Sequence, residues 1–249
     1  MAVLSRRVLA SAFARSFLIQ GSWNYRTMLG TGFAFAMLPA LRLIFKENPV
    51  ALEASVRRHL EHFNAHPYLS NIALGAALRL EADGESEDAV RRFKVAVRGP
   101  LGGLGDALVW ASWLPAVSLS ALSLVWLGVP GWVAVLVFLA VYNLGHVWLR
   151  AWGFKAGLAE GMGVARSLGR VALARLTERV RALAALLLGV LLGTVLGGEG
   201  GLGEAGVIWG GLAAAAFVAG VLVGHRLWRP TAVTVVATVA VLATFGWFL

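Results

Sequence analysis

The sequence predicts an all-α integral membrane protein in which amphipathic N-terminal helices and re-entrant hairpins are followed by about five transmembrane helices. Two features of composition favour this fold class: 59% of the 249 residues are hydrophobic and only 14% are charged, whereas about a quarter of the residues in soluble domains are charged. The third feature is the distribution of charge. Residues 107–149 contain no Asp, Glu, Lys or Arg, and a run of that length can cross a bilayer twice.

The charged residues favour lipid over nucleic acid as a partner. The chain has 22 basic and 13 acidic residues. Because the basic residues flank apolar runs instead of forming one patch, we expect contact with membrane lipids and with no nucleic acid. The absence of cysteine excludes disulfides and thiolate metal sites. Arg6, Arg7 and Arg15 interrupt the N-terminus, which therefore lacks the apolar core of a cleaved signal peptide.

Residues 1–25 form a predicted amphipathic N-terminal arm. Apolar residues recur between positions 3 and 19 with Arg and Ser between them. This pattern favours a short helix on the membrane surface, and an internal packing helix is the alternative. The break at residues 21–25 carries Trp23 and Tyr25, which are residues of the kind that anchor a chain at a membrane interface.

Residues 26–106 are predicted to form a re-entrant or hairpin core region that includes a cytoplasmic amphipathic helix. The uncharged segments 27–41 and 68–78 are too short to span a bilayer, and they are typical of the interrupted helices of some transporters. Between them, Asn48 and Pro49 suit the N-cap and the first position of a helix. Apolar residues then recur every three or four positions, which predicts one apolar face.

Two segments follow before the long uncharged run. The acidic residues of segment 81–88 predict a solvated loop. Segment 99–106 contains Gly99, Pro100 and Gly105 and ends on Asp106. Because its four glycines and one proline do not favour a helix, we expect a non-helical bend, which a membrane tolerates only where protein shelters it or a cavity adjoins it.

Asp106 strengthens the prediction of a site at this bend. A carboxylate beside an apolar span is costly unless a partner, a helix N-terminus or a polar ligand holds it. The alternative is that Asp106 simply caps the following helix.

The second half of the chain is predicted to alternate between membrane spans and short connections. Residues 107–149 form a transmembrane helix pair with a turn at 128–131. Residues 150–181 carry seven basic and two acidic residues, so this basic connection is cytoplasmic by the positive-inside rule. Residues 182–249 then form three transmembrane helices and end outside.

Polar residues at the breaks are candidates for ligand binding. Asn64 is a neutral amide, which can bind sugar hydroxyls without the desolvation cost of a charge, and a helix C-cap is its alternative role. Trp23 and Asn24 pair an aromatic ring with an amide, which also suits a sugar, and an interfacial anchor is the alternative for them.

The sequence contains no constellation typical of catalysis or metal binding. His59, His62 and His66 are close in sequence, but their spacing does not match the His-Glu-x-x-His pattern. The glycine-rich segment lacks the Lys-Ser/Thr of a nucleotide P-loop. We therefore predict no catalytic residue, no metal and no cofactor.

Several separated motifs carry a resemblance to a known family. They are Gly21-Ser22-Trp23-Asn24-Tyr25, Gly32-Phe33, Met37-Leu38-Pro39-Ala40, Arg58-His59-Leu60-Glu61-His62-Phe63-Asn64-Ala65-His66-Pro67-Tyr68, Gly99-Pro100-Leu101-Gly102-Gly103-Leu104-Gly105-Asp106, Tyr142-Asn143 and Gly153. In order and spacing, over residues 5–165, these motifs resemble the IID membrane component of the mannose/fructose/sorbose-type phosphoenolpyruvate-dependent sugar phosphotransferase system (PTS).

The resemblance implies a multi-pass subunit of the bacterial inner membrane that is not itself an enzyme. It implies pairing with a IIC membrane subunit, in a trimer of heterodimers, to form the path of a hexose. The sugar would bind where the two subunits meet and move by an elevator-like displacement. A cytoplasmic IIB subunit, supplied by IIA, would phosphorylate the hexose, and IID would carry no phosphorylated residue.

Together the residues and the resemblance predict a set of substrate-binding residues: Trp23, Asn24, Asn64, Gly99, Pro100, Gly105 and Asp106. The chain also departs from the family pattern. Leu29 stands where the family usually has Gln, and Leu114 stands where it usually has Arg. The loss of these polar groups motivates an alternative function, that of a transport-incompetent regulatory or assembly paralogue without the sugar site.

Overall fold

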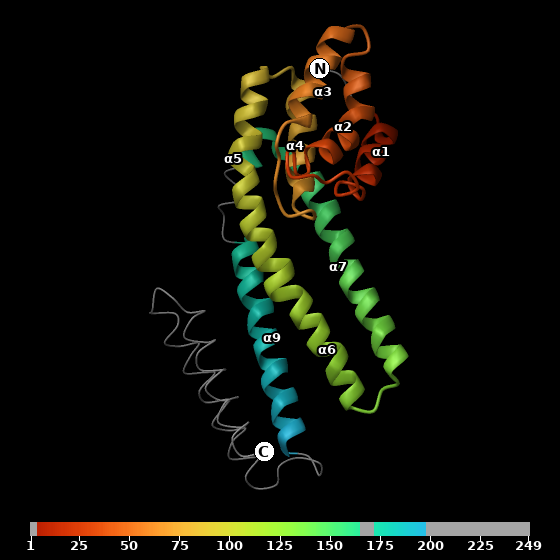
Figure 1. Cartoon of the computed structure of the whole chain (residues 1–249), viewed down its shortest axis with the longest axis vertical. Helices are drawn as coiled ribbons and strands as arrows, with labels where there is room; N and C mark the ends of the chain where they lie inside the picture. Colours follow the sequence, from red (N-terminus) through yellow and green to blue (C-terminus); the bar gives the residue numbers. More distant parts are fainter. Residues whose placement is uncertain (1–3, 165–171, 198–249) are drawn as a thin grey trace, which may run out of the picture. The chain divides into compact units, whose positions relative to one another are not determined.

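The computed structural model describes residues 4–164 and 172–197, which form helices joined by short connections (Figure 1). The chain divides into two compact units, Met1–Ala184 and Ala185–Leu249. Within the first unit, the N-terminal helices α1 to α4 lie together at one end, and α6 and α7 extend away from them as a hairpin. All candidate site residues belong to this first unit.

Helix α1 (Arg6–Ser16) packs one face on the rest of the protein. Its N-cap Ser5 accepts a hydrogen bond from the Val8 N–H, and its buried Ala12 joins the hydrophobic core. Helix α2 (Gly30–Ile44) approaches the chain after α1 so closely that a Cβ on Gly32 would lie 1.9 Å from the carbonyl oxygen of Ile19. The N-terminal arm therefore packs one face against the core, and its position relative to the membrane surface stays a prediction.

Helix α3 (Pro49–Leu60) begins as the sequence predicts. The Asn48 side chain accepts a hydrogen bond from the Ala51 N–H at 3.0 Å, and Pro49 occupies the first turn. The polar face carries the exposed ion pair of Glu53 and Arg57.

Helix α4 (Ser70–Asp83) is buried along most of its length and contacts α2, α5 and α7. The uncharged segment 68–78 therefore forms the centre of the protein core. The fully buried side chains of this core come mainly from α2 and α4, namely Phe33, Met37, Leu41, Ile72, Leu74 and Leu78, together with Phe63 and Leu101.

Residues 83–88 are exposed, as predicted, but the predicted loop at 81–88 is confined to residues 84–86. Helix α4 continues to Asp83, and Gly84 ends it with a left-handed φ of 75°. The Ser86 side chain caps the next helix by accepting from the Ala89 N–H, which places Glu87 in the first turn of that helix. Acidic residues are favourable there because of the helix dipole.

The predicted non-helical bend at residues 99–106 is also wrong. Helix α5 (Glu87–Gly105) runs through the glycines and Pro100 and continues as the π-helix η1 (Asp106–Trp113) and helix α6 (Leu114–Trp126). Asp106 lies inside this continuous helix and does not act as an N-cap, since its own N–H is directed at the carbonyls of Gly102 and Gly103. A continuous helix satisfies the backbone groups internally, which lipid cannot do.

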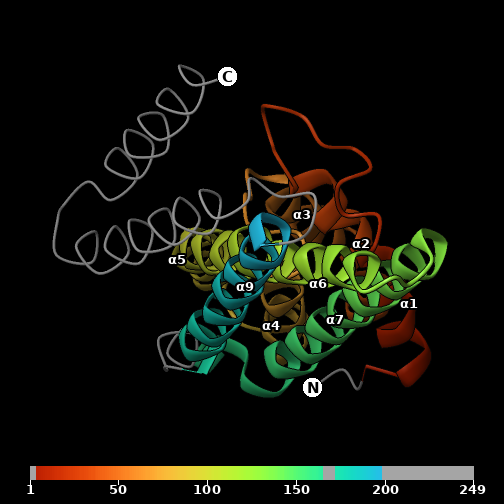
Figure 2. The same cartoon turned by 90° about the horizontal axis from the view of Figure 1, so that it is seen from below.

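Helices α6 and α7 (Gly131–Glu160) form the predicted hairpin, and the turn contains Gly128 with a φ of 84°. They lie side by side in Figure 2. Two helical stretches of the described residues, Glu87–Trp126 and Gly131–Gly163, are long and apolar enough to cross a membrane. The second includes the short helix η2 (Gly161–Gly163).

Helix α7 packs closely on α4 because glycines line the contact. A Cβ on Gly157 would lie 2.1 Å from the carbonyl oxygen of Ile72, and one on Gly75 would lie 2.2 Å from that of Phe154. Helix α9 (Ala172–Gly197) follows. Most of the region predicted to form three transmembrane helices, residues 198–249, lies outside the described residues, as do residues 165–171 of the basic connection.

Candidate functional site

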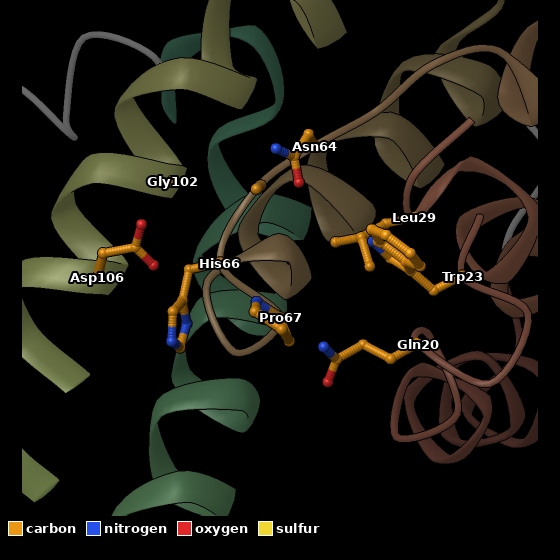
Figure 3. A pocket seen from close by; sticks show the side chains of 9 residues that line it. Gln20, Trp23, Leu29, Asn64, His66, Pro67, Gly102 and Asp106 are labelled. Atoms are coloured by element: carbon orange, nitrogen blue, oxygen red, sulfur yellow. The ribbon is translucent and has the colours of Figure 1, made fainter. Parts of the chain in front are cut away.

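A cavity of about 190 Å³ lies between the chain that precedes α2, the loop that follows α3, and the junction of α5 with η1. Figure 3 shows Asp106 on one side, Asn64 and His66 on the loop in the middle, and Trp23 and Leu29 on the opposite side. The cavity is lined by Gln20, Trp23, Leu29, Asn64, Ala65, His66, Pro67, Gly102 and Asp106.

The loop after α3 is held in place by Phe63, which is fully buried. The Phe63 N–H donates to the carbonyl of Thr27 at 3.2 Å, and its carbonyl accepts from the Leu29 N–H at 2.9 Å. These bonds fasten the loop to the chain before α2 and leave the next residue, Asn64, exposed at the cavity. Asn64 does not cap α3, because that helix ends at Leu60 with Glu61 at the C-cap position.

Trp23 and Asn24 have different surroundings. Trp23 lines the cavity and is 45% exposed. Asn24 is not among the lining residues, since its side chain shapes the local turn: Oδ1 accepts from the N–H groups of Arg26 and Thr27, and Nδ2 donates to the Thr27 hydroxyl at 2.8 Å.

The glycine-rich helix supplies the opposite wall. Gly102 and Asp106 line the cavity one helical turn apart, and Asp106 is exposed. Gly105 lies behind this wall, where a Cβ would come within 2.1 Å of the Cβ of His66. Gly99 and Pro100 are exposed on α5 and are not among the lining residues.

His66 is a lining residue that the sequence analysis did not select. It is 2% exposed, and its Nδ1 accepts a hydrogen bond from the Tyr68 N–H at 3.2 Å. The pKa of His66 is lowered to about 4, mainly by burial and to a smaller extent by the positive charge of Arg150. The ring is therefore neutral at physiological pH. Pro67 disfavours a helical conformation at His66, but no local signal in the sequence shows that His66 is buried.

An aromatic and polar cluster lies next to His66. The Tyr68 ring stacks on His146 with centroids 3.9 Å apart, and its hydroxyl lies 3.0 Å from that of Tyr142. Arg150, buried in α7, donates to His146 Nε2 at 2.7 Å and to the Ser16 carbonyl at 2.8 Å. This cluster connects the loop after α3 to α1 and α7.

A second buried cluster supports the same loop from the side of α3. Glu81 accepts hydrogen bonds from Nε and Nη2 of Arg58, at 2.8 and 2.6 Å, and lies 2.8 Å from Nε2 of His59. Burial alone would raise the pKa of the Glu81 carboxyl, but the hydrogen bonds from His59 and Arg58 outweigh it and lower the pKa to about 2. Lys94 from α5 donates to the Arg58 carbonyl at 2.6 Å.

Burial lowers the pKa of His59 in this cluster to about 4. The cluster therefore holds one carboxylate, two cations and a neutral imidazole, and it connects α3, α4 and α5 where the loop begins. Within the described residues, no group of three His, Asp or Glu side chains could hold a metal ion.

Comparison with known proteins identifies the family. The model of the PTS system mannose/fructose/sorbose family IID component matches residues 3–198. The chain belongs to this IID family. The resemblance inferred from the motifs is thereby confirmed, and the IID component is a membrane translocation subunit.

Relatives and solved structures agree with this assignment. This IID component is 34% identical to the mannose-specific EIID component of Escherichia coli K12, over 76% of this chain and 68% of the relative. It is 32% identical to the sorbose-specific EIID component of Klebsiella pneumoniae, over 74% and 68%. The fructose permease IID component of Bacillus subtilis is 28% identical, over 76% and 70%.

Two solved structures share the fold of this IID component. One is a chain of the cryo-EM structure of the mannose transporter ManYZ in complex with microcin E492, with a TM-score of 0.61 and 28% identity over 100% of this chain and 99% of that one. The other is described as the structure of a membrane protein, with a TM-score of 0.72 and 26% identity over 98% and 97%. These two matches confirm the predicted fold class, that of an all-helical membrane protein.

Proposed function

We propose that this IID component forms, with a IIC membrane subunit, the translocation path for a hexose that a IIB subunit phosphorylates during uptake. The observation that carries the proposal is the cavity, which brings Trp23, Asn64 and Asp106 together from three separate segments. An amide and a carboxylate can hydrogen-bond sugar hydroxyls, and an aromatic ring can pack on the apolar face of a sugar.

The openness of the cavity supports a second subunit as its missing wall. Asn64 and Asp106 are exposed, and Trp23 is half-exposed. A ligand site usually buries most of the surface of its ligand, and this chain alone leaves these groups uncovered. We therefore assign the facing wall to IIC, in a trimer of heterodimers, with IIA and IIB on the cytoplasmic side of the bacterial inner membrane.

The charge pattern supports the orientation of the chain. The basic connection at 150–181 lies on the cytoplasmic side, after the hairpin at 107–149, and the spans of 182–249 lead to an external C-terminus. The N-terminal arm 1–25 and the hairpin region 26–106 carry the site.

The alternative of a subunit without a sugar site is not favoured. Leu29, which by the family pattern stands in place of an amide, lines the cavity, but Leu114 does not. Gln20, Asn64 and Asp106 remain as polar lining groups. We assign to Leu29 a role in the choice of sugar, because an apolar wall favours a hexose whose facing edge carries no hydroxyl.

Uptake of labelled hexose tests the proposal in cells that carry the matching IIC, IIB and IIA subunits. Asn64→Ala and Asp106→Ala each remove a hydrogen bond to the sugar and lower the apparent affinity about tenfold or more. The control is Glu85→Ala, which removes an exposed carboxylate between α4 and α5. With equal amounts of protein in the membrane, uptake that is unchanged in both site variants would contradict the site.

A further inference from the structure

His66 contains a polar atom for which the fold provides no partner. Among the side chains that line the cavity, Nε2 of His66 is the buried atom without a hydrogen bond to any described residue. Because Nδ1 accepts from the Tyr68 N–H, the proton of the neutral imidazole is assigned to Nε2. His66 therefore holds a hydrogen-bond donor that is unused in the isolated chain.

The neighbours of the imidazole are poor acceptors. Its ring lies 5.3 Å from the ring of Trp110 and 5.0 Å from that of Tyr68, and the Tyr68 hydroxyl already contacts that of Tyr142. Gly105 provides the space that the imidazole occupies. A buried N–H without an acceptor is destabilising, so a ligand that supplies an oxygen gains binding free energy at this position.

We propose that Nε2 of His66 donates a hydrogen bond to a hydroxyl of the bound hexose and thereby contributes to sugar specificity. The inference rests on the proposed function of the cavity. Since Nε2 is covered in this structure, a neighbouring side chain moves when the sugar binds, while the hydrogen bond from the Tyr68 N–H to Nδ1 keeps the imidazole in place. The Trp110 ring lies next to the imidazole and is 46% exposed, so we infer that Trp110 is the side chain that moves.

Two substitutions separate this role from support of the backbone. His66→Gln carries an amide N–H at about the reach of Nε2, whereas His66→Asn keeps an acceptor near the position of Nδ1 for the Tyr68 N–H but cannot reach the sugar. His66→Leu is a second variant without a donor. Each is purified as the complete membrane complex with IIC, and the dissociation constant of the hexose is measured together with those of a series of monodeoxy hexoses.

We expect His66→Gln to bind the hexose as the unaltered complex does, and His66→Asn and His66→Leu to bind it about 3- to 10-fold more weakly. One monodeoxy hexose should bind weakly to the unaltered complex, and His66→Asn should not lower its affinity further. The hydroxyl that this sugar lacks is then the one that His66 contacts. Full affinity in His66→Asn with reduced affinity in His66→Gln would overturn the inference in favour of backbone support, while the proposed function would stand. Absence of hexose binding in the unaltered complex would overturn both.

Discussion

At the scale of single residues, the buried carboxylate of Glu81 stabilises the packing of α3, α4 and α5. It is the counter-charge for Arg58, which is also buried. We expect Glu81→Gln to lower the free energy of unfolding by about 3–5 kcal/mol, because the buried Arg58 guanidinium loses its anion. Denaturant or thermal unfolding in detergent measures this. Glu53→Gln, which breaks an exposed ion pair, should cost about 1 kcal/mol or less, and equal losses in both variants would contradict the account.

The same measurement as a function of pH tests the charge states of this cluster. The pKa of His59 is lowered from 6.5 to about 4 in the folded protein. Between these pH values His59 binds a proton in the unfolded chain but not in the folded one, so the free energy of unfolding falls as the pH drops from 6.5 towards 4. The pKa of Glu81 is lowered from 4.5 to about 2, so its stabilisation is complete above pH 4.5 and is lost as the pH falls towards 2. His59→Gln should reduce the slope between pH 6.5 and 4 by at most about 1.4 kcal/mol per pH unit. An unchanged slope would show that His59 is protonated in the folded state.

Glu81 also shows where reading the sequence residue by residue fails. Seen within the run 81–88, it resembles its solvated neighbours, because its partners Arg58 and His59 lie more than twenty residues away in the sequence. Asn48 was predictable because a cap depends on residues three positions apart, and the bond to Ala51 is the one the sequence indicates. Local interactions could be predicted from the sequence, whereas buried pairs between distant segments could not.

At the scale of helices, the contact between α4 and α7 depends on residues without side chains. We expect Gly157→Ala to destabilise the protein by about 1–3 kcal/mol, because the added Cβ meets the Ile72 carbonyl and pushes the helices apart. Gly103→Ala is the matched control, since no atom lies within 4 Å of a Cβ there and alanine favours a helix by up to about 1 kcal/mol. Thermal midpoints of the two variants in detergent measure the difference. A loss of stability in both variants, or in neither, would argue against the close packing of α7 on α4.

The glycine-rich segment was the largest error of the sequence analysis at this scale. Intrinsic propensities predict a bend from Gly99 to Asp106, yet α5 and η1 run through it. In a long apolar segment the need to satisfy every backbone group outweighs the cost of glycine, about 1 kcal/mol or less per residue relative to alanine. The glycines serve packing instead: Gly105 makes room for His66, and Gly102 borders the cavity.

At the scale of the whole molecule, three segments distant in sequence form one cavity. Trp23, Asn64 and Asp106 could be chosen from the sequence because each lies at a break or at the edge of an apolar run, and all three line the cavity. Asn24, Gly99, Pro100 and Gly105 share those motifs but are not among the lining residues. Gln20 and His66 were missed because no local pattern marks either residue, and His66 reaches the cavity only because the loop after α3 packs against α5.

Protection of a single thiol tests the central claim, that this cavity binds the hexose. The chain has no cysteine, so Gln20→Cys introduces one thiol into the cavity wall, and Ser22→Cys introduces one that is exposed nearby and not among the lining residues. Each variant is assembled with a cysteine-free IIC subunit, and the rate of thiol modification is measured with and without hexose. At a hexose concentration about ten times the dissociation constant, we predict that modification of Gln20→Cys slows about tenfold and that of Ser22→Cys does not change. Equal rates with and without hexose at Gln20→Cys would contradict the account.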